Sequence, residues 1–255
     1  MSEGTLSDTV SVCVATYNGG KYVKHQLTSI LDQLGPDDEI IIVDDASTDD
    51  TVAIIERMGE PRISVTRNVS NLGYVRTFER AVSLARGDIV FLSDQDDEWM
   101  SGRVGAMCAA HQRGAVVAGN LVLLGNDAPL PHPITRRPWY LTRPSSRHTV
   151  RNRIKVLGGV APYFGCAMSI RREFLDVILP FPERLTESHD LWIAIAANTA
   201  GEMVHLGTPV IRRRLHDSNA SPSRPRGPAA VLRARLMLVG ICMDAIVRVR
   251  RIRRR

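Results

Sequence analysis

Aromatic residues are scarce in this sequence. Phe, Trp and Tyr together make up 5% of its 255 residues. Proteins that bind single-stranded nucleic acid stack bases on aromatic side chains, so this scarcity argues against such a partner. The formal net charge of +6 does not change that conclusion, because six arginines fall within residues 248–255 and the rest of the chain is close to neutral. We therefore expect no nucleic-acid partner.

Cysteines are also few, and their spacing matches no common structural use. The four cysteines, at positions 13, 108, 166 and 242, form no CxxC pair, and no two histidines have the spacing of a zinc site. Cys13 and Cys166 lie in apolar segments. This placement favours buried, reduced thiols in a cytosolic protein over a disulfide or a metal site.

Long apolar runs and a leader pattern are missing as well. The first ten residues, MSEGTLSDTV, lack the basic and apolar stretches of a secretory signal, so we expect none. No uninterrupted apolar run approaches the roughly 18 residues typical of a transmembrane helix. The chain length and the 44% hydrophobic content suit one large α/β domain, alone or with an appendage.

The first half of the chain alternates short apolar runs with amphipathic stretches. Residues 39–43, EIIIV, are apolar on both faces, as expected for a strand inside a parallel sheet. The alternation predicts βαβ units and hence a Rossmann-like α/β fold with a mostly parallel central sheet flanked by helices. The predicted strands are 10–15, 39–43, 62–66 and 88–92, and the predicted helices are 22–34, 49–58 and 72–85.

The pattern weakens after residue 100. The predicted elements are a helix at 103–112, a strand at 115–124, a loop at 125–150, a strand at 163–170, a helix at 190–200 and a short hairpin at 204–212 around Gly207. Residues 217–228, DSNASPSRPRGP, have the composition of a linker. We therefore divide the chain into a main domain (1–216), a linker (217–228) and a basic amphipathic C-terminal helix (229–255).

Polar clusters follow three of the predicted strands. They are Thr16-Tyr17-Asn18, Asp44-Asp45-Ala46-Ser47 and Asp94-Gln95-Asp96-Asp97. Open α/β sheets bind ligands beyond the carboxyl ends of their strands, and parallel strands would bring the clusters to one edge. Carboxylates gathered there repel one another unless a cation neutralises them, and Mg²⁺ is commonly held by carboxylates plus substrate phosphates. The alternative is that each Asp only caps the helix or turn that follows it.

The motifs in this half resemble those of a known family. VSVCVATYNGGKYVKHQLTSIL, IIIVDDASTDDT and RNVSNLGYVRTFERAVSLARGDIVFLSDQDDEW occur in the order found in family 2 glycosyltransferases with a GT-A fold. The resemblance covers residues 8–115 closely, and these would form the nucleotide-sugar-binding half, with 116–216 as the acceptor half. The SDQDDEW form is most similar to the rhamnosyltransferase-like branch, which acts on bacterial cell-surface polysaccharides.

The resemblance implies a donor-binding role for specific residues. Asp45 would hydrogen-bond the base, with Asp44 and Ser47 shaping its loop. Asp94 and Asp96 would form the DxD element, and Asp97 would support them. The remaining expected donor-binding residues are Thr16 and Tyr17 at the nucleobase and ribose, and Arg67 and Gly73 at the border of the nucleotide.

The second half matches the family in three shorter segments. In ESHDLW (187–192), Asp190 would be the general base that deprotonates the acceptor hydroxyl. In RLHDSN (214–219), His216 would lie near the metal or the diphosphate, so the expected metal ligands are Asp96, Asp94 and His216. GCAM (165–168) resembles the strand beside the acceptor site. Without the family pattern, Asp190 could be only a helix N-cap and His216 a surface histidine.

The implied activity is an inverting, metal-dependent sugar transfer. The donor would be a UDP- or dTDP-sugar, with rhamnose as one candidate sugar, the cofactor Mn²⁺ or Mg²⁺, and the acceptor a saccharide or lipid-linked saccharide. A phosphatase of the haloacid dehalogenase type fits poorly, because it places its Asp-x-Asp on the first strand. A sugar nucleotidyltransferase also fits poorly, because residues 15–22, ATYNGGKY, do not form a long glycine-rich loop. A non-catalytic nucleotide-sugar-binding or scaffold protein of the same fold remains the alternative.

The C-terminal helix allows two interpretations. Residues 229–249 are amphipathic and lead into RVRRIRRR, and an anionic membrane would attract such a cluster. Peripheral contact with the inner face of the cell membrane is then one expectation for a cytoplasmic protein. Packing of the helix on the domain or on a partner protein is the other.

Overall fold

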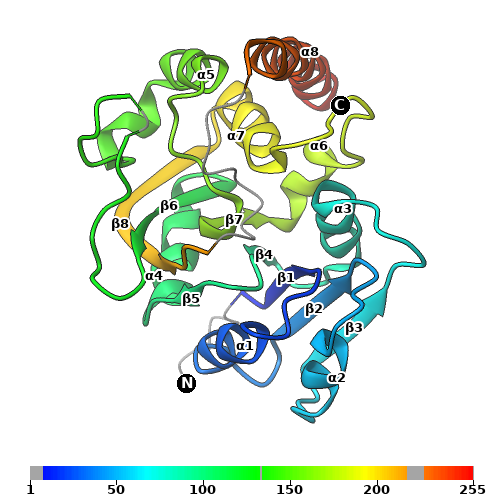
Figure 1. Ribbon diagram of the computed structural model, residues 1–255. Helices are drawn as coiled ribbons and strands as arrows, with labels where there is room; N and C mark the ends of the chain where they lie inside the picture. Colours follow the sequence, from blue (N-terminus) through cyan, green and yellow to red (C-terminus); the bar gives the residue numbers. More distant parts are fainter. Residues whose placement is uncertain (1–7, 133, 217–226, 255) are drawn as a thin grey trace, which may run out of the picture.

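The computed structural model describes residues 8–132, 134–216 and 227–254. Within them, one mixed eight-stranded sheet lies between two sets of helices, with strand order β3-β2-β1-β4-β7-β6-β8-β5 (Figure 1). The strands are β1 (Val10–Thr16), β2 (Glu39–Asp44), β3 (Ile63–Arg67), β4 (Ile89–Ser93), β5 (Glu98–Trp99), β6 (Val116–Leu123), β7 (Met168–Arg171) and β8 (Met203–Arg213).

Helices connect most of the strands and cover both faces of the sheet (Figure 1). They are α1 (Val23–Leu31), α2 (Thr51–Glu56), α3 (Tyr74–Leu84), α4 (Arg103–Ala110), α5 (Thr149–Gly158), α6 (Leu175–Ile178), α7 (His189–Ala200) and α8 (Pro228–Ile252). The α/β fold expected from the sequence is therefore confirmed, including a long C-terminal helix.

The central strands are apolar throughout because both of their faces are buried. In β1, Val12 and Val14 pack against the α1, α2 and α4 side, whereas Cys13 packs against the α3 and α7 side. In β2, Ile40 packs on the α1, α2 and α4 side and Ile41 packs on the α3 and α7 side. Successive side chains of a strand point to opposite faces, so a run without alternation fills two cores at once.

The topology brings the ends of three strands to one edge. β1 pairs in parallel with β2 and with β4, and Thr16 stands opposite Asp44 at the end of the first pair. The polar residues that follow β1, β2 and β4 therefore lie on the same rim. Beyond β4 the sheet changes direction, because β7 pairs antiparallel with both β4 and β6.

The hairpin expected at 204–212 is wrong. This segment is a single strand, β8, which pairs in parallel with β6 and antiparallel with β5. Gly207 has φ 77°, and the register with β6 shifts between Ala118 and Asn120. A glycine with positive φ inside one strand marks a bulge, which has the same local residue preference as a turn.

Two other predictions for the second half need correction. The strand expected at 163–170 is shorter and later, since Gly165–Ala167 form a turn of 3-10 helix and β7 begins at Met168. Helix α5 was not predicted, and the loop expected up to residue 150 ends where this helix starts at Thr149. Its mixture of arginines and β-branched residues weakens the apolar periodicity that identifies a helix.

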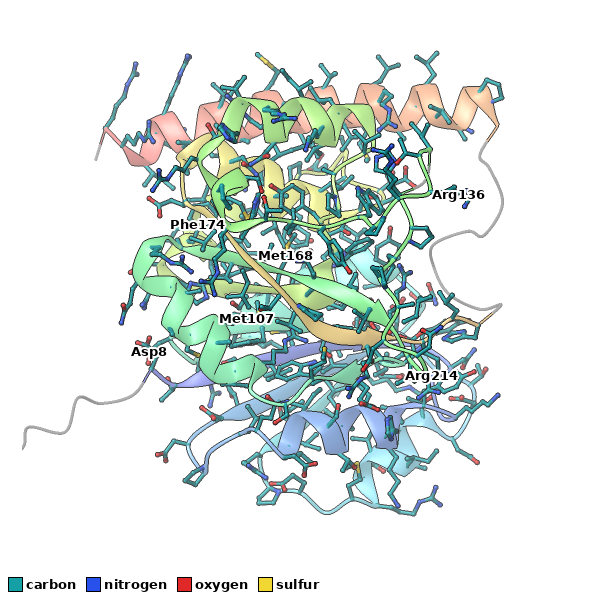
Figure 2. All side chains as sticks on the ribbon, turned by 90° about the vertical axis from the view of Figure 1, so that its left-hand side faces the viewer. Asp8, Met107, Arg136, Met168, Phe174 and Arg214 are labelled. Atoms are coloured by element: carbon teal, nitrogen blue, oxygen red, sulfur yellow. The ribbon has the colours of Figure 1, made fainter. Side chains whose placement is uncertain are left out.

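The C-terminal helix packs on the main domain. Leu238, Ile241, Ala245 and Val249 of α8 are buried in the core that contains α6 and α7. The helix runs along one end of the molecule with α5 beside it (Figure 1 and Figure 2). The predicted linker at 217–228 lies almost entirely outside the described residues. Among the described helices, none is both long and apolar enough to cross a membrane.

Candidate active site

A cavity of about 470 Å³ opens at the carboxyl rim of β1, β2 and β4. Its wall also includes the start of α3, the turn before β7 and the start of α7. Most residues expected to bind the donor or catalyse the reaction line this cavity. They are Thr16, Tyr17, Asp45, Gly73, Asp94, Asp96 and Asp190. Asp44, Ser47 and Arg67 lie behind the wall, where they support it, and His216 contacts Asp96.

The Asp44 carboxylate organises the loop after β2. It is fully buried and accepts hydrogen bonds from the Thr16 hydroxyl at 2.9 Å and from the Ser47 amide at 2.9 Å. The Arg67 guanidinium lies 3.4 Å from the same carboxylate and also donates to the Ser47 carbonyl. A buried carboxylate requires such partners, because an uncompensated charge is costly away from water. Asp44 therefore holds the ends of β1, β2 and β3 in register.

Asp45 joins the rim to the segment that precedes α3. Its carboxylate accepts hydrogen bonds from the Asn68 side-chain amide at 2.8 Å and from the backbone amides of Leu72 at 2.8 Å and Gly73 at 2.9 Å. Gly73 has φ 81°, a conformation that favours glycine and points its amide toward Asp45. Asp45 thus fixes the loop at 68–73 and also faces the cavity. Its contact with the nucleobase stays a prediction.

Tyr17 and Gln95 connect the ends of β1 and β4. The Tyr17 amide donates to Gln95 Oε1 at 2.9 Å, and Gln95 Nε2 donates to the Tyr17 carbonyl at 3.0 Å. The Tyr17 side chain remains 46% exposed at the cavity. This reciprocal pair leaves the aromatic ring available for a flat ligand group, as expected for the predicted nucleobase pocket.

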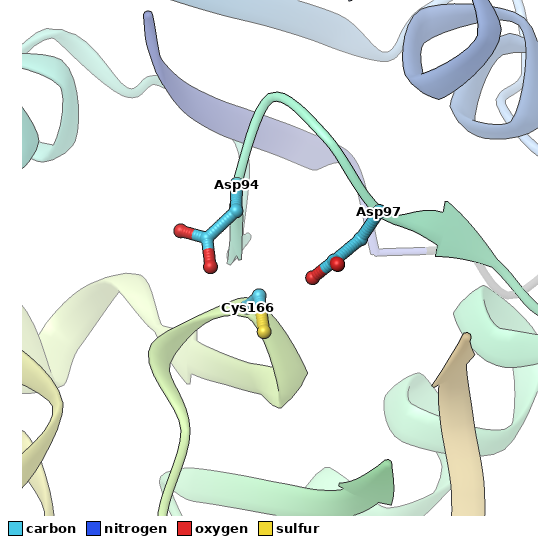
Figure 3. A group of neighbouring side chains, drawn as sticks. All are labelled: Asp94, Asp97 and Cys166. Carbon is cyan, nitrogen blue, oxygen red and sulfur yellow. The ribbon is translucent and has the colours of Figure 1, made fainter. Parts of the chain in front are cut away.

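An acidic group lies at the base of the cavity. Ligand atoms of Asp94, Asp97 and Cys166 all fall within 4.8 Å of one another, and the three side chains are close neighbours (Figure 3). Burial, together with repulsion from neighbouring carboxylates, raises the pKa of Asp94 and of Asp97. Asp97 Oδ2 is buried without a hydrogen-bond partner among the described residues.

This group fits a hard divalent cation. Carboxylate oxygens are the ligands that Mg²⁺ and Mn²⁺ prefer, and a cation would relieve both the repulsion and the unpartnered Asp97 oxygen. Cys166 is a weaker ligand candidate, since burial raises the pKa of its thiol and keeps it protonated. Asp97 was expected only to support Asp94 and Asp96. In the structure it belongs to the same group of possible metal ligands as Asp94.

A buried arginine beneath the acidic group was not predicted. Arg103 is 1% exposed, its guanidinium carbon lies 3.9 Å from the centre of the Trp99 ring, and Nη2 donates to the Leu92 carbonyl at 3.2 Å. Burial lowers the pKa of Arg103 to about 9, while the negative charges of Asp97 and Asp94 act in the opposite direction. Arg103 therefore supplies positive charge from the core side. In the sequence it is one more arginine at the start of a helix, so only its burial distinguishes it.

Asp96 contacts His216, the histidine that was expected to lie near the metal or the diphosphate. His216 Nε2 lies 2.7 Å from Asp96 Oδ2, and the His216 ring stacks on Tyr22 with 4.7 Å between ring centres. The backbone amide of Arg214 donates to Asp97 Oδ1 at 3.0 Å, so the segment after β8 is tied to both carboxylates. His216 thus lies close to the acidic group, and its metal-binding role stays a prediction.

Asp190 lines the same cavity from the start of α7. It is half-buried, and the Leu191 amide donates to its Oδ1 at 2.8 Å. Burial raises the pKa of Asp190 to about 6, against hydrogen bonds from Leu191 and Gly165 that favour the carboxylate. A carboxyl group with a pKa near neutrality can accept a proton from a substrate and later release it.

His189, beside Asp190, is a further side chain of the cavity wall. It is 5% exposed, lines the cavity and stacks on Phe78 with 4.3 Å between ring centres. Neither ring nitrogen has a hydrogen-bond partner among the described residues, and burial lowers its pKa to about 3. A Cβ on Gly165 would come within 2.7 Å of His189 Nε2, so glycine is needed there. The neutral ring therefore brings one donor and one acceptor to the cavity.

Comparison with solved structures defines the class of fold. A structure of residues 1–349 of TarS from S. aureus in complex with UDP-GlcNAc superposes on 94% of this chain and 72% of its own, with a TM-score of 0.68 and 22% identity. At this identity the likeness shows the fold alone. The molecule is an α/β protein of the GT-A type.

Comparison of sequences then identifies the family. The model of "Glycosyl transferase family 2" matches residues 11–179, so the chain belongs to glycosyl transferase family 2. It is 34% identical over 95 residues to WfaP of Escherichia coli, described as a UDP-Glc:alpha-D-GlcNAc-diphosphoundecaprenol beta-1,3-glucosyltransferase, covering 37% of this chain and 38% of WfaP. It is 37% identical over 98 residues to RfbG of Shigella flexneri, described as a dTDP-rhamnosyl transferase, covering 36% of this chain and 34% of RfbG.

The family and the matched relatives support a coarse functional statement. The chain is related to glycosyltransferases of bacterial cell-surface polysaccharides. The matched segment is only about a third of the length of WfaP and of RfbG. The donor sugar, acceptor and partners of the whole protein are therefore matters for proposal.

Proposed function

We propose that this protein is an inverting glycosyltransferase that moves a sugar from a nucleoside diphosphate donor to an acceptor hydroxyl. The observation that carries the proposal is the placement of Asp190 in the same cavity as the acidic group of Asp94 and Asp97. One wall offers a base, and the opposite rim offers groups for a cation and a diphosphate. An inverting displacement needs this combination and no second, nucleophilic carboxylate.

The chemical step is a single displacement. The acceptor oxygen forms a bond to the anomeric carbon while the bond from that carbon to the diphosphate oxygen breaks. Asp190 accepts the proton of the acceptor hydroxyl, and the nucleoside diphosphate leaves with the electron pair of the broken bond. The half-buried position of Asp190 suits this role, because a raised pKa makes its carboxylate a more effective base.

Mn²⁺ or Mg²⁺ is the cofactor that the acidic group fits. Asp94 and Asp97 would hold it, and Asp96, with His216 beside it, is the further expected ligand. When bound, such a cation would supply Lewis-acid stabilisation for the diphosphate leaving group. Arg103 stabilises the carboxylates from the opposite side when they are ionised.

The donor is proposed to be a UDP- or dTDP-sugar, with rhamnose as one candidate. WfaP is described as using UDP-Glc, RfbG as a dTDP-rhamnosyl transferase, and TarS has been solved with UDP-GlcNAc. The acceptor is proposed to be a saccharide or a lipid-linked saccharide of a cell-surface polysaccharide. We propose that the reaction takes place in the cytoplasm, on the inner face of the membrane.

A thermal-shift panel tests donor and metal binding together. UDP and dTDP, with Mn²⁺ or Mg²⁺, should raise the melting temperature, whereas the same nucleotides with EDTA should raise it much less. At a free nucleotide concentration 100 times Kd, binding adds about 2.7 kcal/mol to stability. ADP with Mn²⁺ serves as the control for unspecific metal–nucleotide binding. A melting temperature that no nucleotide raises would contradict the proposal and favour a scaffold protein of the same fold.

A further inference from the structure

Helix α8 has two apolar faces, and only one of them is buried. The buried face consists of Leu238, Ile241, Ala245 and Val249, which pack into the core. On the opposite side, five apolar side chains recur at intervals of three or four residues and are 53% to 64% exposed. This outer stripe consists of Leu232, Leu236, Val239, Met243 and Val247. Isolated exposed apolar residues are ordinary, but a regular stripe along a helix marks an interaction surface.

The neighbouring helix adds to the apolar surface. Val150 and Ile154 of α5 are 57% and 63% exposed. The two helices lie side by side at one end of the molecule, and Arg235 Nη2 donates to the Gly158 carbonyl at 3.1 Å (Figure 1 and Figure 2). Exposed apolar side chains therefore occur on both of these neighbouring helices.

The domain holds α8 in a fixed orientation. Arg248 Nη1 donates to the carbonyls of Val177 at 3.2 Å and Ile178 at 3.1 Å, and Arg253 Nη2 donates to the Ala200 carbonyl at 2.7 Å. Because these contacts fix the orientation of α8, the outer stripe points away from the domain. A partner can bind it without the cost of ordering the helix first.

The charges around the stripe select the kind of partner. Arg233, Arg250, Arg251 and Arg254 are exposed, and their side chains make no hydrogen bond or ion pair with the described residues. The only acidic residue in α5 and α8 is Asp244, which lies 3.2 Å from Arg184. A second copy of this surface would bring arginines against arginines, which is unfavourable. An anionic surface with an apolar interior matches both features.

We propose that α8 and α5 form a docking face for an anionic lipid bilayer. The outer stripe enters the boundary between headgroups and acyl chains, and the arginines contact lipid phosphates. The helix lies on the membrane and does not cross it, in agreement with the absence of a spanning helix among the described residues. This docking goes beyond the proposed transfer reaction and does not depend on it.

Vesicle flotation with the full-length protein tests the docking face. The wild type should float with vesicles of phosphatidylcholine and phosphatidylglycerol and bind pure phosphatidylcholine much less. The double variant Leu236→Ser, Met243→Ser should bind the anionic vesicles at least roughly tenfold more weakly than the wild type, because two apolar side chains no longer enter the lipid. Arg250→Ala with Arg251→Ala should weaken binding and reduce its sensitivity to salt.

A matched control distinguishes docking through α8 and α5 from nonspecific vesicle binding by exposed apolar side chains. Val69→Ser with Leu84→Ser removes two exposed apolar side chains outside α5 and α8, and should leave vesicle binding unchanged. Both serine variants should keep the wild-type melting temperature, because the replaced side chains are exposed. Equal flotation of the wild type and the α8 serine variant would overturn the proposal. So would a wild type that does not float and instead forms a dimer that the α8 variant disrupts.

Discussion

Asp190 illustrates what a single side chain contributes to this site. Asp190 is the second residue of α7, whose N-cap is Ser188, so it is not the helix N-cap that the sequence left open as an alternative; its Oδ1 accepts a hydrogen bond from the Leu191 amide. It also lines the cavity that holds the acidic group, and burial raises its pKa to about 6. This carboxyl group therefore faces the space where an acceptor would bind.

Asp190→Asn should greatly reduce turnover while leaving the donor bound. The amide keeps the shape of the side chain and can still accept from the Leu191 amide, but it cannot take a proton. General-base catalysis typically contributes about 10²–10⁴ in rate, so kcat should fall by that factor. Steady-state turnover measures the loss, and the nucleotide-dependent melting shift checks donor binding. Turnover near the wild-type rate would refute the role of Asp190 as base.

Turnover should also depend on pH through this residue. The active form is the carboxylate, and its pKa of about 6 means that protonation inactivates the enzyme as the pH falls through that value. With the metal bound, Asp94 and Asp97 are kept ionised by the opposite charge and do not add a transition in this range. The measurement is kcat against pH at saturating metal and donor. A flat profile across pH 6 would argue that Asp190 is not the group that takes the proton.

Helix α8 shows how an element can serve two surfaces. Apolar residues occur on more than one side of this helix, and that distribution by itself indicates either burial or membrane contact. The structure assigns one face to the core through Leu238, Ile241, Ala245 and Val249 and leaves the outer stripe exposed. Packing on the domain and contact with a membrane, the two interpretations of the sequence, therefore involve different residues and are compatible.

Substitutions on the two faces of α8 should have different effects on stability. Ile241→Ala removes a fully buried side chain and should lower the free energy of unfolding by about 2–5 kcal/mol. Val247→Ala, which is 61% exposed, should change it by less than about 0.5 kcal/mol. Urea unfolding at neutral pH measures both. Similar losses for the two variants would mean that α8 is not packed as described.

At the scale of the whole molecule, the cavity depends on both halves of the chain. Residues 8–115 contribute the rim of β1, β2 and β4, and the wall opposite comes from Gly165, Cys166 and Asp190. Antiparallel pairing of β7 with β4 brings the second half next to the acidic group. Neither half alone would enclose a ligand.

Local sequence was sufficient for the parts of the fold that depend on local physics. The strands predicted at 10–15, 39–43 and 88–92 correspond to β1, β2 and β4, because doubly buried strands require unbroken apolar runs. Polar residues directly after those runs indicated the rim. The helix at 229–252 was also recognised from its periodicity.

Tertiary structure alone decided the features that arise from distant contacts. The bulge at Gly207 has the same residue signal as a turn, and only pairing of β8 with β6 distinguishes them. Arg103 and Cys166 are ordinary residues in the sequence and meet the acidic group only after folding. Which face of α8 is buried was likewise set by the core beneath it. Sequence patterns report the neighbours along the chain, whereas these features depend on neighbours that only the folded sheet and helices bring together.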